Sequence, residues 1–147
     1  MVERQLYCFN RKIWVAATPE EYVRQEILQL MLQLGYPSSY IAVEKDLAAL
    51  SYAPKTLSFP DRRADIVCYT KQPSKGLRPL LIVECKAIPL TQKEISQVIG
   101  YNYLIKAAFI ALVNQKERRL GWYDPSLSDY KFIDYIPSYT QLINSLN

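Results

Sequence analysis

The stretch Pro79-Leu80-Leu81-Ile82-Val83-Glu84-Cys85-Lys86 decides the fold of this chain. Its apolar run predicts a buried β-strand, and the strand becomes ionic where it ends. Side chains alternate along a strand, so Glu84 and Lys86 are expected on the same face. Buried charge is costly unless it is paired or holds a metal. Two interpretations stay open at this point: surface charges where a strand meets solvent, or a functional site.

A second strand is predicted upstream, over Arg62-Arg63-Ala64-Asp65-Ile66-Val67-Cys68-Tyr69. Residues 71–79 between the two strands are rich in turn residues and charges, which indicates a hairpin with a longer loop. Antiparallel pairing would bring Asp65 close to Glu84. Two carboxylates at close range are unfavourable unless a cation lies between them. The pattern therefore predicts a divalent-ion site of oxygen ligands, with Lys86 beside it.

An acid, a spacer and then Glu84-Cys85-Lys86 after a strand resembles the PD-(D/E)XK nuclease superfamily. The chain is most similar to the N-terminal nuclease-like domain of type I restriction enzyme R subunits. The similar stretches span roughly residues 10 to 115 in the family's order. They are Thr18-Pro19-Glu20-Glu21-Tyr22-Val23-Arg24-Gln25, Gly35-Tyr36-Pro37, Ile41-Ala42-Val43-Glu44-Lys45, Arg63-Ala64-Asp65-Ile66-Val67 and Leu81-Ile82-Val83-Glu84-Cys85-Lys86-Ala87.

The resemblance implies one restriction-endonuclease-like domain over residues 1–147, of the α/β class, with a central mixed β-sheet flanked by helices. It also implies a metal-dependent endonuclease that hydrolyses phosphodiester bonds, with DNA as the expected substrate. Asp65, Glu84 and the backbone carbonyl of Cys85 would hold Mg²⁺, or Mn²⁺ in its place. Lys86 would orient or help deprotonate the attacking water.

Two acids compete for the first position of this motif. The literal Pro-Asp dipeptide is Pro60-Asp61, which lies between Phe59 and two arginines in a setting typical of a loop. Asp65 begins the apolar strand, so its backbone is held by a regular element, where preorganised ligands belong. We therefore assign Asp65 to the site and interpret Asp61 as a loop acid.

Three further residues are candidates for the site. Gln97 and Tyr101 lie four apart on a predicted helix and so share a face, as in superfamily members whose Gln-xxx-Tyr helix faces the metal. The alternative is a polar surface residue beside a core tyrosine. The first helix of the superfamily often supplies an acid. Glu21 is preferred here over Glu26, although Glu21 also fits a capping box with Thr18.

The remaining elements follow from periodicity and helix caps. Helices are predicted from Thr18 to about Leu34, from Thr91, capped with Glu94, to about Ala107, and over residues 139–146. Strands are predicted over residues 12–15, 41–44, 109–113, 120–123 and 130–136, the last at a sheet edge, whereas residues 46–58 are weakly patterned.

Composition narrows the function classes. The chain has 147 residues, enough for a sizeable core, and no uncharged stretch as long as a membrane span. It has no histidine, which excludes His-based triads and His-ligated zinc. Its three cysteines, Cys8, Cys68 and Cys85, are odd in number without metal-ligand spacing, which favours a reduced, cytoplasmic protein.

The charge balance is a mild basic excess, 18 basic against 14 acidic residues, with net charge +4. Basic residues lie mostly in predicted loops: Arg11-Lys12, Arg62-Arg63, Lys71, Lys75 and Arg78, and Lys116, Arg118 and Arg119. Basic clusters that lie near the acidic site would neutralise phosphates of a nucleic acid. The other basic residues are interpreted as solvent-exposed charges in loops.

A second function stays open, because the 147 residues contain none of the helicase motor of a type I R subunit. The chain would then be a non-catalytic DNA- or partner-binding module with a nuclease-like fold. In either case we expect nucleic acid as a partner, no membrane, and a homodimer or another protein that delivers DNA.

Overall fold

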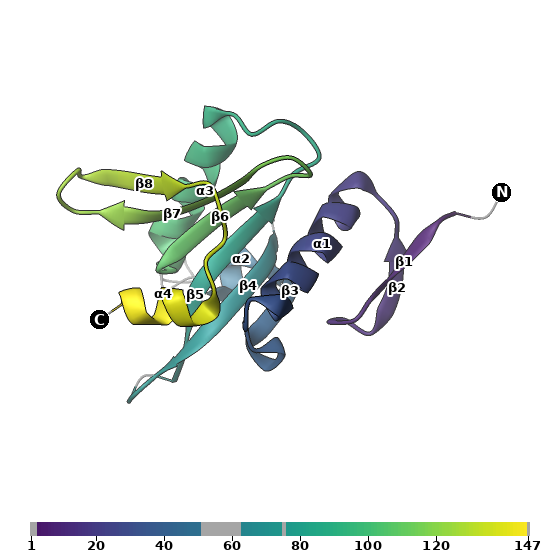
Figure 1. Ribbon diagram of the computed structural model, residues 1–147, viewed down its shortest axis with the longest axis horizontal. Helices are drawn as coiled ribbons and strands as arrows, with labels where there is room; N and C mark the ends of the chain where they lie inside the picture. The colour runs from purple at the N-terminus through teal and green to yellow at the C-terminus, as the bar shows by residue number, and fades with distance from the viewer. Residues whose placement is uncertain (1–2, 51–62, 75, 147) are drawn as a thin grey trace.

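The computed structural model describes residues 3–50, 63–74 and 76–146. A six-stranded mixed sheet of order β3-β4-β5-β6-β7-β8 forms its centre (Figure 1). The helices are α1 (Pro19–Gln33), α2 (Leu47–Leu50), α3 (Gln92–Ile105) and α4 (Tyr139–Ser145), with a 3₁₀ turn η1 (Ser38–Tyr40). The strands are β1 (Gln5–Cys8), β2 (Ile13–Ala16), β3 (Ile41–Asp46), β4 (Arg63–Gln72), β5 (Gly76–Cys85), β6 (Phe109–Val113), β7 (Arg118–Asp124) and β8 (Asp129–Ile133). The predicted α/β class and sandwich are confirmed.

The central hairpin, β4 with β5, pairs antiparallel as predicted, with Ile66 opposite Val83. The predicted long loop over residues 71–79 is wrong, because β4 continues to Gln72 and β5 begins at Gly76. Proline and glycine made this segment look like a loop. Pro79 is tolerated in β5 because the register shifts at the Cys68/Tyr69 step, and proline is accommodated at such irregularities.

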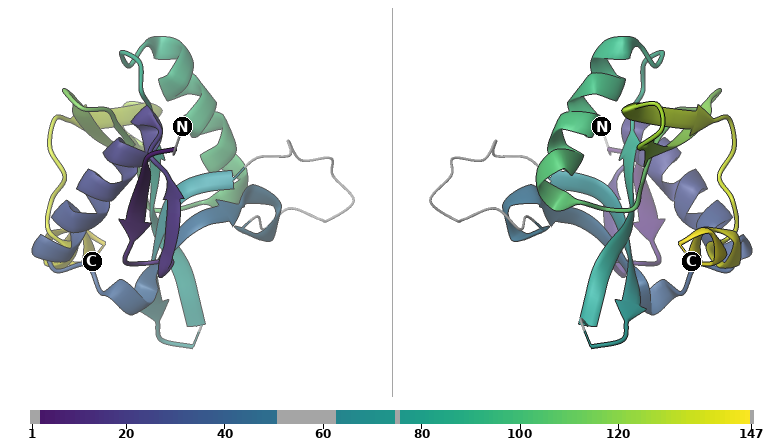
Figure 2. Two further views of the ribbon diagram at one scale, coloured as in Figure 1. Left: turned by 90° about the vertical axis from the view of Figure 1, so that its right-hand side faces the viewer. Right: turned by 90° about the vertical axis from the view of Figure 1, so that its left-hand side faces the viewer.

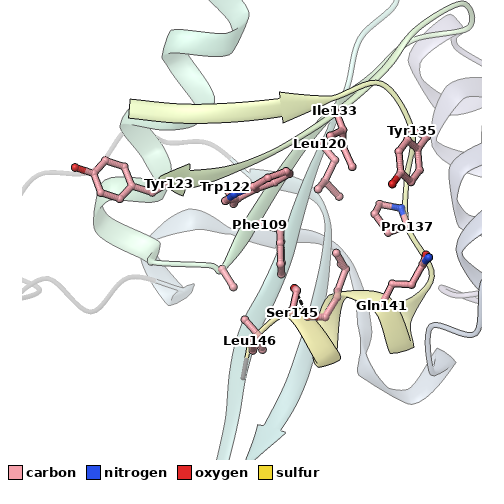
Figure 3. A pocket seen from close by; sticks show the side chains of 12 residues that line it. Phe109, Leu120, Trp122, Tyr123, Ile133, Tyr135, Pro137, Gln141, Ser145 and Leu146 are labelled. Atoms are coloured by element: carbon pink, nitrogen blue, oxygen red, sulfur yellow. Dashed lines mark hydrogen bonds between the residues drawn. The ribbon is translucent and has the colours of Figure 1, made fainter. Parts of the chain in front are cut away.

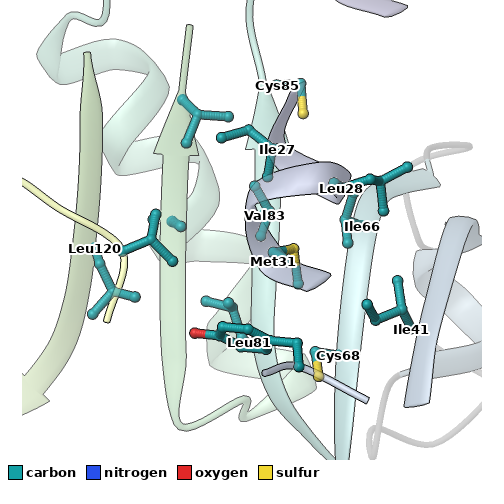
Figure 4. Packing of buried hydrophobic residues seen from close by; sticks show 14 of the residues in the cluster. Ile27, Leu28, Met31, Ile41, Ile66, Cys68, Leu81, Val83, Cys85 and Leu120 are labelled. Atoms are coloured by element: carbon teal, nitrogen blue, oxygen red, sulfur yellow. The ribbon is translucent and has the colours of Figure 1, made fainter. Parts of the chain in front are cut away.

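Helix α1 covers one face of the sheet. Thr18 caps it as predicted, accepting a hydrogen bond from the Glu21 backbone N–H at 3.1 Å. Its buried residues pack on β4 and β5 (Figure 4). This contact joins Ile27, Leu28 and Met31 to Ile66, Cys68, Leu81, Val83 and Cys85. Full burial of each large aliphatic side chain contributes about 1.5–3 kcal/mol, so the contact fixes α1 against the two central strands.

Helix α3 covers the opposite face, as the two side views show (Figure 2). Ile95 and Val98 pack there on Ile110 and Leu112 of β6. The predicted cap is confirmed, because Glu94 accepts a hydrogen bond from the Thr91 backbone N–H at 2.8 Å. The helix ends two residues earlier than predicted.

That earlier end has a local cause. Lys106 adopts a left-handed conformation, φ 61°, and caps α3 directly after Ile105. The helix is the crossover that makes β5 and β6 parallel. Its first turn therefore follows closely after the Glu84-Cys85-Lys86 end of β5.

The sequence did not indicate β1 or α2. Strand β1 pairs with β2 in a separate two-stranded sheet, which lies against α1 on the side away from β5 (Figure 1). The predicted strand over residues 12–15 is displaced by one residue, and the predicted edge strand ends at Ile133 instead of Ile136. No helix in the described part of the chain is long and apolar enough to cross a bilayer.

Candidate functional site

The hairpin brings Asp65 to the end of β5, as the sequence predicts. The Asp65 Oδ2 atom accepts a hydrogen bond from the Cys85 backbone N–H at 2.8 Å. Asp65 is partly buried, with a side chain 13% exposed. The start of β4 and the end of β5 thus meet at one edge of the sheet.

Glu84 and Lys86 do not behave as surface charges at a strand end. The Glu84 side chain is 5% exposed and that of Lys86 is 14% exposed. The Lys86 Nζ atom lies 3.9 Å from Glu84 Oε2, which agrees with the expected common face. Because Glu84 is buried, its interpretation as a surface charge is wrong. A buried carboxylate is costly unless it is paired or holds a metal.

A guanidinium, that of Arg24 in α1, joins two of the acids. Its Nη2 atom lies 2.7 Å from Asp65 Oδ1 and its Nη1 atom lies 2.5 Å from Glu21 Oε1. Arg24 is 6% exposed. Burial lowers the pKa of Arg24, but the hydrogen bond and charge of Asp65 and the charge of Glu21 outweigh burial and raise it. Among the described residues, the positive charge that Asp65 needs is thus supplied by Arg24, which lies between Asp65 and Glu21.

Glu21 is directed into the same cluster. Its Oε2 atom accepts hydrogen bonds from Arg11 and Gln25, each at 2.8 Å. Burial alone raises its pKa, but the bonds from Gln25 and Arg11 and the charges of Arg24 and Arg11 outweigh burial and lower it. The predicted capping-box bond is absent among the described residues, since the Thr18 N–H bonds to the Ala16 carbonyl instead. The rival candidate, Glu26, is exposed on α1.

Glu44 of β3 completes the arrangement, which we call the charged cluster: Arg11, Glu21, Arg24, Glu44 and Asp65. Glu44 lies 3.6 Å from Arg11 and 3.4 Å from Arg24. Its backbone is left-handed, φ 55°, between residues that pair regularly with β4. The turn after β1, helix α1, β3 and β4 each contribute to the cluster. Within the cluster two guanidiniums face three carboxylates, a formal sum of −1. The exposed Arg63, 3.8 Å from Glu44, balances that charge from outside.

The donor atoms at this edge suit a hard cation. Asp65 and Glu84 offer carboxylate oxygens, the ligands that Mg²⁺ prefers. The bonds from Arg24 and Cys85 use one lone pair on each Asp65 oxygen, and an ionised carboxylate has about four. Within residues 3–50, 63–74 and 76–146, however, no three acidic or cysteine side chains converge as a ready metal site. The chemistry fits a divalent ion, which would have to share Asp65 with Arg24.

Helix α3 places its candidates over the same strands. Tyr101 packs against the cluster that contains Ala64, Val67 and Ile82. Gln97, one turn earlier on the same face, is half-buried. In the described part of the chain, Gln97 makes no hydrogen bond to Lys86. Asp61, the rejected acid, lies outside the described residues.

An apolar hollow of about 480 Å³ lies elsewhere, between α4 and strands β6 to β8 (Figure 3). Phe109, Trp122 and Leu142 line it, and no residue of the charged cluster does. Phe109 begins β6, so the hollow is at the opposite end of that strand from Val113 and the acids. Nothing in the described structure indicates what would cover it.

Sequence reasoning missed Arg24 and Glu44. The Glu21/Arg24 spacing of three is a recognisable pairing signal on a helix. The contacts of Arg24 with Asp65 and Glu44 join distant segments, and no local pattern announces them.

A family model described as the type I restriction enzyme R protein N terminus matches residues 19–137. No curated protein and no solved structure matches this chain.

Proposed function

Since this chain belongs to the family of the type I restriction enzyme R protein N terminus, we propose that it is a metal-dependent endonuclease that hydrolyses phosphodiester bonds of DNA. The observation that carries the proposal is the meeting of Asp65, Glu84 and Lys86 at one sheet edge, with both carboxylates largely buried. A buried acid pair beside a lysine is seldom kept for stability, because each charge is costly to desolvate.

The proposed ligands are Asp65, Glu84 and the backbone carbonyl of Cys85. A bound Mg²⁺, or Mn²⁺ in its place, supplies positive charge that eases deprotonation of water and offsets charge on the phosphodiester. Lys86, held near Glu84, orients the attacking water or stabilises the developing charge. Glu21 acts through Arg24, which fixes the direction of Asp65. Gln97, which makes no hydrogen bond to Lys86 in the described part of the chain, would position the attacking water.

Cleavage of plasmid and labelled oligonucleotides with Mg²⁺ or Mn²⁺ tests this proposal. We expect activity in the wild type and none above background in Asp65→Ala, Glu84→Ala or Lys86→Ala. Glu26→Gln is the matched control, because Glu26 is an exposed acid on α1. Cleavage that survives both Asp65→Ala and Lys86→Ala would refute the assignment.

Thermal unfolding tests the metal separately. A ligand that binds only the folded state stabilises it by about 2.7 kcal/mol at 100 times its dissociation constant. We expect Mn²⁺ or Mg²⁺ to raise the Tm of the wild type and to leave that of Asp65→Asn unchanged. An equal shift in both proteins would remove Asp65 from the ligand set and return Asp61 to consideration.

A non-catalytic DNA- or partner-binding module is the second candidate. It is favoured by the pairing of Asp65 with Arg24, which satisfies the acid without a metal. Calorimetric metal titration beside DNA binding separates the two functions. DNA affinity that is indifferent to Mg²⁺, with no cleavage on long incubation, would support the binding module. The three free cysteines favour a reducing compartment such as the cytoplasm for either function.

A further inference from the structure

A groove of about 630 Å³ lies beside the turn that joins β6 to β7. We call it the basic groove, because Lys116, Arg118 and Arg119 line it. Two acids, Glu117 and Asp134, also line it, which leaves a formal charge of +1 (three basic minus two acidic side chains). The Glu117 Oε1 atom lies 3.9 Å from Arg119 Nη2. Tyr135, 53% exposed, adds an accessible aromatic ring to the lining. Basic side chains together with an accessible ring are the combination that binds a nucleic-acid strand.

The strand register places this groove at the same sheet edge as the acids. Glu84 pairs with Leu112 of β6, and Leu112 pairs with Arg119 of β7. Neighbouring strands lie about 4.8 Å apart, so the Cα atoms of Glu84 and Arg119 are about 10 Å apart. The cluster of Lys71 and Arg78 is different. It flanks the turn between β4 and β5, which is the far end of the same two strands.

Asn114 makes the turn a fixed structure. Its Oδ1 atom accepts hydrogen bonds from the backbone N–H groups of Lys116 and Glu117, at 2.8 and 2.6 Å. Its Nδ2 atom donates to the Ile88 carbonyl at 3.0 Å. Ile88 follows Lys86 by two residues. The basic turn is therefore tied directly to the segment that leaves the acidic site.

We propose that the basic groove binds backbone phosphates of the DNA strand whose scissile phosphate lies at Asp65, Glu84 and Lys86. The proposal rests on the proposed function for the position of the scissile phosphate. A strand carries one phosphate per about 3.4 Å of axis, so a strand at the acids reaches the groove within a few nucleotides. Each phosphate that a lysine or arginine neutralises releases counterions, which makes affinity depend on salt.

The test is fluorescence anisotropy of labelled duplex DNA at several salt concentrations in EDTA, where binding is measured without cleavage. We expect Lys116→Gln and Arg118→Gln to weaken binding several-fold and each to reduce the slope of log K against log salt by about 0.9. Lys71→Gln is the matched control at the far end of the sheet, with wild-type binding expected. Glu117→Gln should strengthen binding, because it removes a negative charge from the groove. Loss of structure alone cannot produce that increase.

Wild-type affinity in both Lys116→Gln and Arg118→Gln would overturn the proposal, as would an equal loss in Lys71→Gln. A wild type that does not bind DNA would overturn it as well. Cleavage with Mg²⁺ is measured on the same proteins. If DNA binding follows the predicted pattern but no cleavage occurs, the endonuclease proposal is refuted and the groove proposal stands. If cleavage occurs but the groove variants bind DNA like the wild type, the groove proposal is refuted and the endonuclease proposal stands.

Discussion

Arg24 is the more buried of the two arginines in the charged cluster, and only Glu21 is buried more deeply. It forms ion pairs with both Glu21 and Asp65. Asp65 and Glu21 bind different terminal nitrogens of the guanidinium. Loss of Arg24 therefore removes the counter-ion of the partly buried Asp65 and, among the described residues, leaves the buried Glu21 ion-paired with Arg11 alone. Breaking a buried pair by removing one partner costs about 3–5 kcal/mol. The Nε–H group of Arg24 is buried without a hydrogen-bond partner among the described residues, so part of this side chain's desolvation is uncompensated.

We expect Arg24→Gln to lower the free energy of unfolding by about 3–5 kcal/mol in urea denaturation. Arg119→Gln is the control, since its partner Glu117 is at 3.9 Å and both side chains are more than 40% exposed. Exposed pairs contribute about 0–1 kcal/mol. Similar losses in the two variants would show that the Arg24 contacts contribute no more than a surface pair.

Glu21 makes the stability depend on pH. Burial raises its pKa, but the bonds from Gln25 and Arg11 and the two arginine charges lower it overall. A folded-state pKa below the unfolded value of about 4.3 means that ionised Glu21 stabilises the fold above that pH. The contribution is lost as the pH falls through the folded-state pKa.

Urea denaturation from pH 7 to pH 3 measures this contribution. We expect the wild type to be more stable than Glu21→Gln at pH 7, and the difference to shrink below a pH of about 4. Glu26→Gln, which changes an exposed acid on the same helix, should follow the wild type throughout. A constant difference between wild type and Glu21→Gln would contradict the role assigned to the ionised carboxylate.

The acids of the site could be predicted from sequence because each follows or begins a strand, where a polar residue interrupts an apolar run. Asp65 and Glu84 are visible for that reason. Arg24 and Glu44 were not, because their significance depends on which segments fold against α1. The direction of Glu21 was also hidden: its spacing from Thr18 fits a cap, and only the positions of Arg11 and Arg24 draw the side chain inward.

At the scale of elements, the Phe132 side chain of β8 packs directly on the backbone of Gly121 in β7. Gly121 pairs with Phe132, and a Cβ atom on Gly121 would lie 2.5 Å from the Phe132 ring. The ring therefore covers the glycine. Phe132 also lines the basic groove, so this contact sets one wall of it.

We expect Gly121→Ala to destabilise the protein by about 1–3 kcal/mol, because the ring must leave its position. In a Phe132→Ala background the same substitution should cost little, which a double-mutant cycle of unfolding free energies measures. Additive losses in the cycle would show that the cost arises from the backbone of β7 and not from the ring.

The central elements could be predicted because their signals are local and strong. Strand β6 has the predicted bounds, and the capped starts of α1 and α3 are where Thr18 and Thr91 place them. Strand β1 was missed because its four residues contain too short an apolar run to stand out. The 71–79 segment was misassigned because turn-forming composition does not reveal a strand that continues through a register shift.

At the scale of the whole molecule, the residues of the candidate site and of the basic groove come from segments far apart in the chain. Glu21, Asp65 and Glu84 come from α1, β4 and β5, and the basic groove is lined by the turn before β7, by β7, and by the end of β8 with the two residues after it. The antiparallel hairpin was sufficient to predict that Asp65 lies beside the end of β5, where it accepts a hydrogen bond from the Cys85 N–H. The alignment of the groove with the acids requires the parallel crossover and two further strand registers, which no sequence pattern in this chain specifies.

Three buried thiols offer a way to time the opening of separate parts of this fold. Cys8, Cys68 and Cys85 are at most 1% exposed and carry no disulfide. A thiol in such a position reacts with an alkylating reagent only after local or global opening. Burial raises the pKa of Cys68 to about 12 and that of Cys85 well above its ordinary value, so these two are inert while folded. Cys8 belongs to the small β1–β2 sheet, outside the central six strands.

We expect Cys8 to be alkylated first under native conditions, with Cys68 and Cys85 following together at the rate of global unfolding. Mass spectrometry of proteolytic fragments after timed alkylation gives the three rates, and a single common rate would show that the small sheet opens only with the rest. The order of labelling would thus reveal whether the part of the chain that carries Arg11 can separate from the acids while the central sheet stays closed.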